Sequence, residues 1–180
     1  MASKETKRLE NTFKDYMKEN KHHFSRIDNH NKEIENELNK IKDNVYDHLK
    51  KRCADQFSWL EKHATVYYND LGINVHVNEN LDGMSADAVL DDLHKCAKQN
   101  DHGLKEFFDK ANARKENIVK SNNNCINSCT FRSEDKTDKE MKTCIDRCFK
   151  SSFNDTDYLI SEIKDKISDV KSKINYQKIL

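Results

Sequence analysis

The residues best suited to chemistry in this sequence are four cysteines, arranged as two Cys-x-x-x-Cys pairs. Cys125 and Cys129 form the first pair, Cys144 and Cys148 form the second, and fourteen residues separate the two pairs. Four thiols can bind a zinc ion, carry out redox exchange, stay as buried thiols, or form structural disulfides.

The spacing within each pair sets the geometry. Residues four apart on a helix lie on one face, one turn from each other. Two such helices joined by a short connection run antiparallel, and residues that face each other then have a constant index sum. Because Cys125 with Cys148 and Cys129 with Cys144 share one index sum, the spacing predicts an outer and an inner disulfide in the same register.

The other chemistries fit this pattern less well but stay open. Structural zinc sites more often take Cys-x2-Cys knuckles from turns. A catalytic redox pair normally has the Cys-x-x-Cys spacing at a helix start. Four reduced thiols without a role are not expected at such symmetric positions. We therefore expect structural disulfides, with no metal and no cofactor.

Long helices must position these cysteines. The chain has no proline and three glycines, and apolar residues recur at steps of three and four from Leu9 to Leu60, with a kink or break expected between 20 and 33. We expect a loop over 72–84, because "INVHV" is one short strand with nothing to pair with. Interruptions are also expected at "QNDHG" (99–103), at the polar connection before Cys144, and as a slack patch at "SSFNDTD".

These elements predict an all-α fold of long helices that form two antiparallel helical hairpins, the C-terminal one closed by two disulfides. The predicted division is 1–84, a long N-terminal helix and loop, and 85–180, a helical region that contains the cysteine hairpin. The apolar stripe from Leu9 to Leu60 is longer than a globular domain needs. A final heptad pattern of apolar residues, typical of a coiled coil, begins at Ile160. The simplest role of that heptad is core packing; the residues we expect to bind a partner are Leu9, Phe13, Tyr16, Ile34, Leu38, Ile41, Val45, Ile163, Ile167, Val170 and Ile174.

Composition excludes several functions. The chain is 35% hydrophobic and 36% charged, with a mean hydropathy of -1.04 and equal numbers of acidic and basic side chains, so nucleic acid binding is not expected. The eight histidines are scattered and no glycine-rich phosphate loop is present, so we do not expect an enzyme. We expect no transmembrane segment, secretory signal or mitochondrial presequence.

The segment "CINSC…CIDRCFKSSF", with Glu140 before the third cysteine and Phe149 and Phe153 after the fourth, resembles the twin Cys-x3-Cys module of the small Tim (Tim10-like) chaperones. The resemblance covers about 104–180. It implies a protein of the mitochondrial intermembrane space, where proteins of this kind are trapped by oxidation and need no cleavable presequence.

The resemblance suggests two functions. We expect a non-catalytic structural accessory subunit on the intermembrane-space side of an inner-membrane respiratory-chain complex, peripheral to the membrane and in contact with other small-Tim-like or twin-cysteine subunits. The alternative is an intermembrane-space chaperone or assembly factor for inner-membrane proteins.

A second resemblance concerns the other two cysteines. Some mitochondrial proteins carry two successive Cys-x3-Cys hairpins, and Cys53 and Cys96 would then be remnants of the first, with Phe57 and Asn100 at the positions of the missing cysteines. Either a Cys53–Cys96 bridge or two isolated core thiols is compatible with the sequence.

Overall fold

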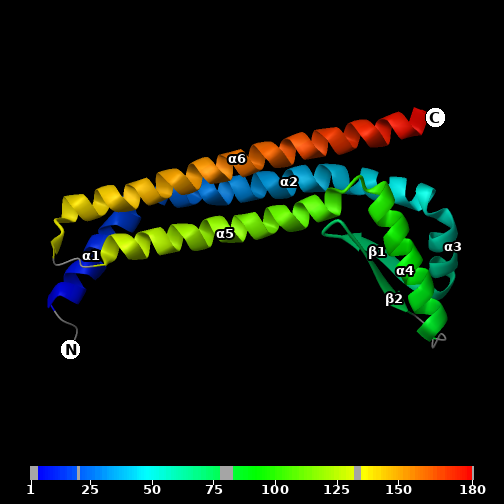
Figure 1. The fold of residues 1–180 in the computed structure, drawn as a ribbon, viewed down its shortest axis with the longest axis horizontal. Helices are drawn as coiled ribbons and strands as arrows, with labels where there is room; N and C mark the ends of the chain where they lie inside the picture. The colour runs from blue at the N-terminus through cyan, green and yellow to red at the C-terminus, as the bar shows by residue number, and fades with distance from the viewer. Residues whose placement is uncertain (1–3, 20, 78–82, 132–134, 180) are drawn as a thin grey trace. The chain divides into compact units, whose positions relative to one another are not determined.

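The computed structural model describes residues 4–19, 21–77, 83–131 and 135–179. These residues are mostly helical, which confirms the predicted helical character, but they also contain a two-stranded sheet. In chain order the elements are α1 Lys4–Glu19, α2 Lys21–Arg52, α3 Ala54–His63, β1 Ala64–Asn69, β2 Gly72–Val77, α4 Gly83–Asn100, α5 Leu104–Thr130 and α6 Asp138–Ile179 (Figure 1).

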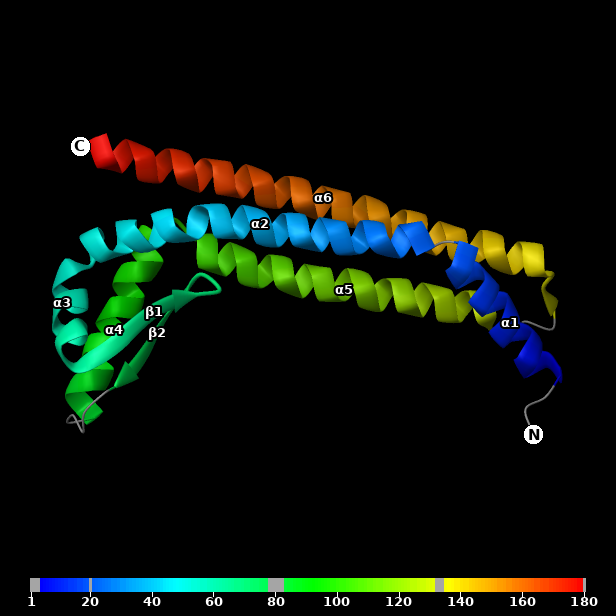
Figure 2. The same ribbon diagram turned by 180° about the vertical axis from the view of Figure 1, so that it is seen from behind.

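The chain divides into two compact units, each built from two separate stretches of sequence. Unit 1 comprises 1–34 and 111–162, and unit 2 comprises 35–110 and 163–180. Helices α2, α5 and α6 therefore each contribute residues to both units. Figure 2 draws the same elements from behind, coloured by residue number. The division at residue 84 expected from the sequence stays a prediction.

In unit 1, side chains of α1 and α2 reach α6 through ion pairs. Arg8 Nη2 lies 2.8 Å from the Asp138 carboxylate, and Arg26 Nη2 lies 2.9 Å from that of Asp157. All four side chains are substantially exposed, so each pair contributes at most about 1 kcal/mol. These pairs orient the N-terminal helices, while most of the packing energy must come from the apolar cluster described below.

Unit 2 holds the longest apolar stripes of the chain. Residues of α2 recur there at steps of three and four, and the C-terminal part of α6 contributes its heptad. Its buried side chains include Ile41, Val45, Leu49, Cys53, Phe57, Leu60, Leu93, Leu104, Phe108, Ile163, Ile167, Val170 and Ile174. These stripes are therefore buried by the chain itself, as expected for amphipathic helices that pack into a core.

The sheet corrects the sequence prediction over 64–77. We expected a loop over 72–84 and no pairing partner for its short strand, but β1 and β2 pair antiparallel, from Ala64 opposite Val77 to Asn69 opposite Gly72. Asp70 and Leu71 form the two-residue turn with φ of 47° and 58°, the positive values that tight hairpin turns require. "INVHV" therefore has a partner in "ATVYYN", whose β-branched and aromatic residues favour a strand.

Two further expectations have different outcomes. The interruption at 99–103 is confirmed, because α4 ends at Asn100, α5 begins at Leu104, and His102 and Gly103 both have positive φ. The slack patch at "SSFNDTD" is wrong, because α6 continues through it. Within this patch the Thr156 hydroxyl donates to the Ser152 carbonyl oxygen at 2.8 Å, so a polar side chain is satisfied inside the helix without breaking it.

Candidate functional site: the paired disulfide clasp

The four cysteines of unit 1 lie beside the connection between α5 and α6. The end of α5 carries Cys125 and Cys129, and the first turns of α6 carry Cys144 and Cys148. The structure joins Cys125 to Cys148 with a Cα–Cα distance of 5.8 Å, and Cys129 to Cys144 with one of 5.7 Å. Both distances are ordinary for disulfides. We call these two bonds the clasp.

A capping box starts α6 just before the clasp. The backbone N–H of Thr137 donates to Glu140 Oε2 at 2.8 Å, and the N–H of Glu140 donates to Thr137 Oγ1 at 3.2 Å. These reciprocal bonds satisfy two donors that the helix itself leaves unpaired. Hydrogen bonding from the Thr137 backbone lowers the pKa of Glu140. Glu140, one of the residues that carry the small Tim resemblance, thus fixes where α6 begins and so where Cys144 and Cys148 lie.

Two basic side chains, one from the connection itself and one from α1, also stabilise the junction between α5 and α6. Lys136 Nζ donates to the carbonyl oxygen of Cys129 at 3.0 Å, which satisfies an acceptor in the last turn of α5. From α1, the Arg8 guanidinium donates to the carbonyl oxygen of Lys136 at 3.2 Å as well as to Asp138. Both contacts place positive charge next to the connection.

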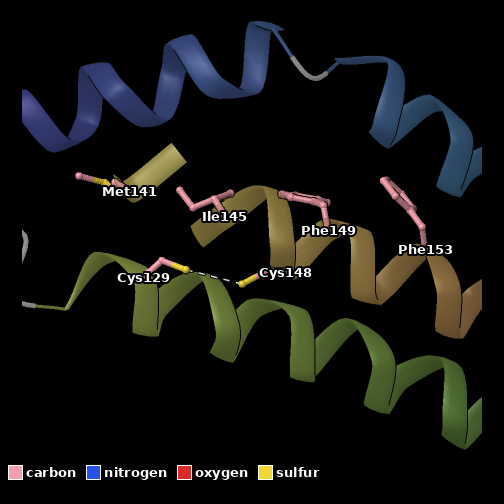
Figure 3. Close-up of a cluster of buried hydrophobic side chains, with 6 residues drawn as sticks. All are labelled: Cys129, Met141, Ile145, Cys148, Phe149 and Phe153. Carbon is pink, nitrogen blue, oxygen red and sulfur yellow. Dashed lines mark hydrogen bonds between the residues drawn. The ribbon is translucent and has the colours of Figure 1, made fainter. Parts of the chain in front are cut away.

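The two bonds of the clasp touch each other. Cys129 Sγ lies 3.6 Å from Cys148 Sγ, the contact drawn as a dashed line in Figure 3. Because disulfide sulfurs carry no proton, this is a sulfur–sulfur packing contact rather than a hydrogen bond. The sulfurs of Cys125, Cys129 and Cys148 lie within 4.8 Å of one another, a spacing that three thiolates could use for a metal, but in the disulfide form none of them is a thiolate.

An apolar ladder continues from the clasp along α6. Its residues recur every four positions and point from α6 toward the N-terminal helices in Figure 3. The cluster comprises Cys129, Met141, Ile145, Cys148, Phe149 and Phe153, all buried, with Ile126 and Cys144 packed against it. The guanidinium of Arg26 on α2 lies 5.4 Å from the centroid of the Phe153 ring, a cation–π distance. The clasp and the apolar ladder therefore belong to one core, which faces the N-terminal helices.

Unit 2 contains a third disulfide, between Cys53 and Cys96, with a Cα–Cα distance of 6.0 Å. Cys53 stands between α2 and α3, and Cys96 is on α4, so the bond ties the α2–α3 junction to α4. The sequence left open whether Cys53 and Cys96 form a disulfide or remain two thiols, and the structure joins them by a disulfide. Asn100 on α4 donates to the Cys96 carbonyl oxygen at 2.8 Å, and Phe57 is buried on α3.

The predicted partner-binding residues have mixed positions. Six of them are at most 2% exposed, within the core of unit 2: Ile41, Val45, Ile163, Ile167, Val170 and Ile174. The expectation that they face a partner does not hold for these six, because the chain covers them itself. Ile34 and Leu38 are half-buried, and the side chains of Leu9, Phe13 and Tyr16 lie outside the described residues.

Sequence analysis missed the large apolar side chains that do face outward. Within the described part of the chain these are Met17, Tyr67, Val119, Phe131, Tyr158 and Tyr176. Tyr158 is 62% exposed and lies over the Arg114 guanidinium, which is 5.9 Å from the ring centroid. Four of them are on helices but off the apolar stripes, and that departure from the helical period is the signal that could have identified them: Met17, Val119, Tyr158 and Tyr176. Tyr67 is on β1 and Phe131 follows α5, so the helical period gives no signal for these two.

Across the described residues, no helix combines the length and apolar character that crossing a membrane requires. No family model matches the chain, and neither the curated proteins nor the solved structures contain a match to it. The function must therefore be argued from the chain's own residues.

Proposed function

We propose that the chain is a non-catalytic structural accessory subunit on the intermembrane-space side of a mitochondrial inner-membrane complex of the respiratory chain. In this proposal, its helices form two antiparallel hairpins, and the clasp closes the C-terminal one. The compartment follows from the resemblance of the cysteine segment to the small Tim module. The six cysteines are all paired, which favours an oxidising compartment and supports this location.

The observation that carries the structural role is the clasp, together with the burial around it. Two disulfides cross-link α5 to α6, and the apolar ladder beside them is buried and faces the N-terminal helices. Each disulfide restrains the unfolded chain and so favours a permanently folded hairpin. A rigid element whose apolar ladder is already occupied suits a fixed position in an assembly.

The alternative is an intermembrane-space chaperone or assembly factor. Val119, Phe131 and Tyr158 favour it, since all three are more than half exposed and belong to unit 1, the unit of the clasp. A chaperone needs accessible apolar side chains for its clients. Val119 lies on α5, Phe131 follows the last residue of α5, and Tyr158 lies on α6. Because the three are scattered, they offer less apolar surface than the stripes that the chain buries.

The first experiment tests assembly. The chain is tagged at its endogenous level, mitochondria are solubilised in a mild detergent, and native electrophoresis is combined with quantitative mass spectrometry. We expect comigration with a respiratory complex at a fixed stoichiometry. Recovery only as a free ring of similar small chains would reject the subunit in favour of the chaperone, and recovery outside mitochondria would reject both.

A second experiment tests whether the clasp acts in retention. Replacing Cys125, Cys129, Cys144 and Cys148 by Ser should reduce accumulation in the intermembrane space, measured by protease protection before and after rupture of the outer membrane. The matched control is Cys53→Ser with Cys96→Ser, which removes a disulfide but leaves the clasp. Equal loss in both variants would show that retention depends on folding in general rather than on the clasp.

A further inference from the structure

Unit 2 contains a cavity that the proposed function does not use. Its volume is about 680 Å³, within the range of small-molecule sites. The turn of the β-hairpin forms one wall, the C-terminal part of α4 another, and the first turns of α5 a third. Its apolar lining comes from Leu49, Tyr68, Leu71, Ile73 and Ala97.

The hydroxyl of Tyr68 is a polar group without a partner in this cavity. Tyr68 is 8% exposed, and within the described residues its hydroxyl takes part in no hydrogen bond. The ring of Tyr46 stacks on it with centroids 5.3 Å apart, which holds the phenol in place. Burial, with a contribution from the charge of Asp101, raises the pKa of Tyr68, so the phenol stays protonated at neutral pH. The Tyr68 oxygen is accessible from the cavity rather than sealed in the core, so a ligand there can donate a hydrogen bond to it.

Asp101 supplies a second polar group in the same cavity. It is 7% exposed, and its two oxygens accept from the backbone N–H groups of Gly103 at 2.9 Å and Lys105 at 3.3 Å. Among the residues described, no cationic side chain lies within ion-pair distance of it. Each carboxylate oxygen has a lone pair left for a further donor. Burial raises the pKa of Asp101, and the two backbone hydrogen bonds and the electrostatic effects of His102 and Lys166 offset this only in part.

The rim adds to the negative charge. The cavity is lined by four carboxylates, of Asp70, Asp101, Glu106 and Asp109, against two ammonium groups, of Lys98 and Lys105. Lys105 pairs with Asp109 at 2.8 Å, and Lys110, outside the lining, pairs with Glu106 at 2.9 Å. Asp70 and Asp101 then face Lys98 alone, and this remaining excess of one carboxylate favours a cation over an anion.

We propose that this cavity binds a primary alkylammonium ion. The ammonium group donates hydrogen bonds to the Asp101 carboxylate and to the Tyr68 phenol oxygen, and the hydrocarbon chain packs against Leu49, Leu71 and Ala97. The proposal is independent of the accessory-subunit role, because it concerns unit 2 alone and needs no partner protein.

Three probes of equal chain length test it on the full wild-type chain by titration calorimetry at neutral pH: hexylammonium, hexanol and hexanoate. We expect hexylammonium to bind at least about tenfold more tightly than hexanol, the equivalent of about 1.4 kcal/mol, and hexanoate not to bind. Absence of saturable hexylammonium binding, or equal binding of hexanol, would overturn the proposal.

Variants then locate the site. Asp101→Asn removes the charge and should abolish the preference for hexylammonium over hexanol. Because Asp101 also accepts bonds at the start of α5, Tyr68→Phe is the second variant: it keeps the ring, removes only the hydroxyl, and should weaken hexylammonium binding several-fold. The control is Asp92→Asn, an exposed carboxylate of α4 outside the cavity lining, which should bind within about twofold of wild type. Unchanged binding in Tyr68→Phe, or an equal loss in Asp92→Asn, would place the ammonium elsewhere.

Discussion

The disulfides of the two units should contribute unequally to stability, although their cysteines are buried alike. Cys53 and Cys129 are both 1% exposed, and Cys96 and Cys144 are both half-buried. We compare two double variants, Cys53→Ala with Cys96→Ala, and Cys129→Ala with Cys144→Ala. Because each pair loses similar packing, the difference between the variants reports mainly on the loops that the bonds close.

The expected magnitudes follow from the sequence separations. The Cys53–Cys96 bond spans 43 residues, and in the chain-entropy model its removal lowers the free energy of unfolding by about 4 kcal/mol. The Cys129–Cys144 bond spans 15 residues, which corresponds to about 3 kcal/mol for an isolated bond. That bond is nested within the 23-residue loop of Cys125–Cys148, which already restrains the unfolded chain, so its own contribution must be smaller. The unit 2 variant should therefore be less stable than the inner-clasp variant by more than about 1 kcal/mol.

Urea unfolding followed by circular dichroism at the helical band, without reductant, measures both losses. Mass spectrometry of the alkylated proteins first checks that each variant keeps its other two disulfides. The reasoning is refuted if removing the inner bond of the clasp costs as much as removing Cys53–Cys96, since nesting would then have no effect on the unfolded chain.

Three smaller changes test the local structure. Thr137→Ala should lower the free energy of unfolding by about 1 kcal/mol, measured in urea, because it removes half of the capping box. The pKa of Glu140 is lowered in the folded state, so its contribution to stability is present above the unfolded pKa and is lost as pH falls through the folded one. The melting-temperature advantage of wild type over Glu140→Gln should therefore disappear as pH falls into and below the usual titration range of glutamate. Gly103→Ala should lower the free energy of unfolding by about 1 kcal/mol, measured in urea, because φ at Gly103 is +73°, a value that alanine rarely adopts. Gly72→Ala is the milder control, because an added Cβ there would lie 3.5 Å from its nearest atom, an ordinary van der Waals contact.

The helices could be predicted because their signal is repeated many times. Steps of three and four recur along α2 and α6, and each further apolar residue reinforces the same period. The pairing of the clasp cysteines was predictable for a similar reason, because one constant index sum accounts for both disulfides. The turn at 101–103 was predictable because Gly103 tolerates a positive φ that most residues avoid.

The sheet and the continuity of α6 depended on contacts that the local sequence does not display. The hairpin turn is Asp70-Leu71, without the glycine that usually marks a two-residue turn, and burial of Leu71 offsets the strain of its positive φ. In α6, the polar stretch after Phe153 looked like a break, but Leu159 and Ile160 are buried just beyond it and hold the helix in register. Packing overrode the local preference in both places.

The Cys53–Cys96 bridge also could not have been settled by spacing alone. The resemblance placed the missing cysteines at Phe57 and Asn100, each four residues after a cysteine. That spacing is helical within α3, where the N–H of Phe57 donates to the Cys53 carbonyl oxygen at 3.1 Å, but α2 ends at Arg52, so Phe57 belongs to a different helix from the residues before Cys53. A helical break at the cysteine itself changes which positions can face each other.

Burial separates the two functional proposals more sharply than the resemblance does. A client-binding chaperone must keep a broad apolar surface accessible, whereas a fixed subunit can bury its stripes and dock through a few exposed side chains. Among the residues described, the regular apolar stripes of α2 and of the C-terminal part of α6 are buried inside unit 2, and the apolar ladder of α6 is buried inside unit 1. The helical periodicity from which we expected a binding surface therefore serves core packing. What faces outward, such as Tyr158 and Val119, is dispersed and bordered by charged residues. Isolated apolar residues of this kind suit specific docking at defined points, and they are poorly suited to holding a long unfolded segment, which is why we place the accessory subunit ahead of the chaperone.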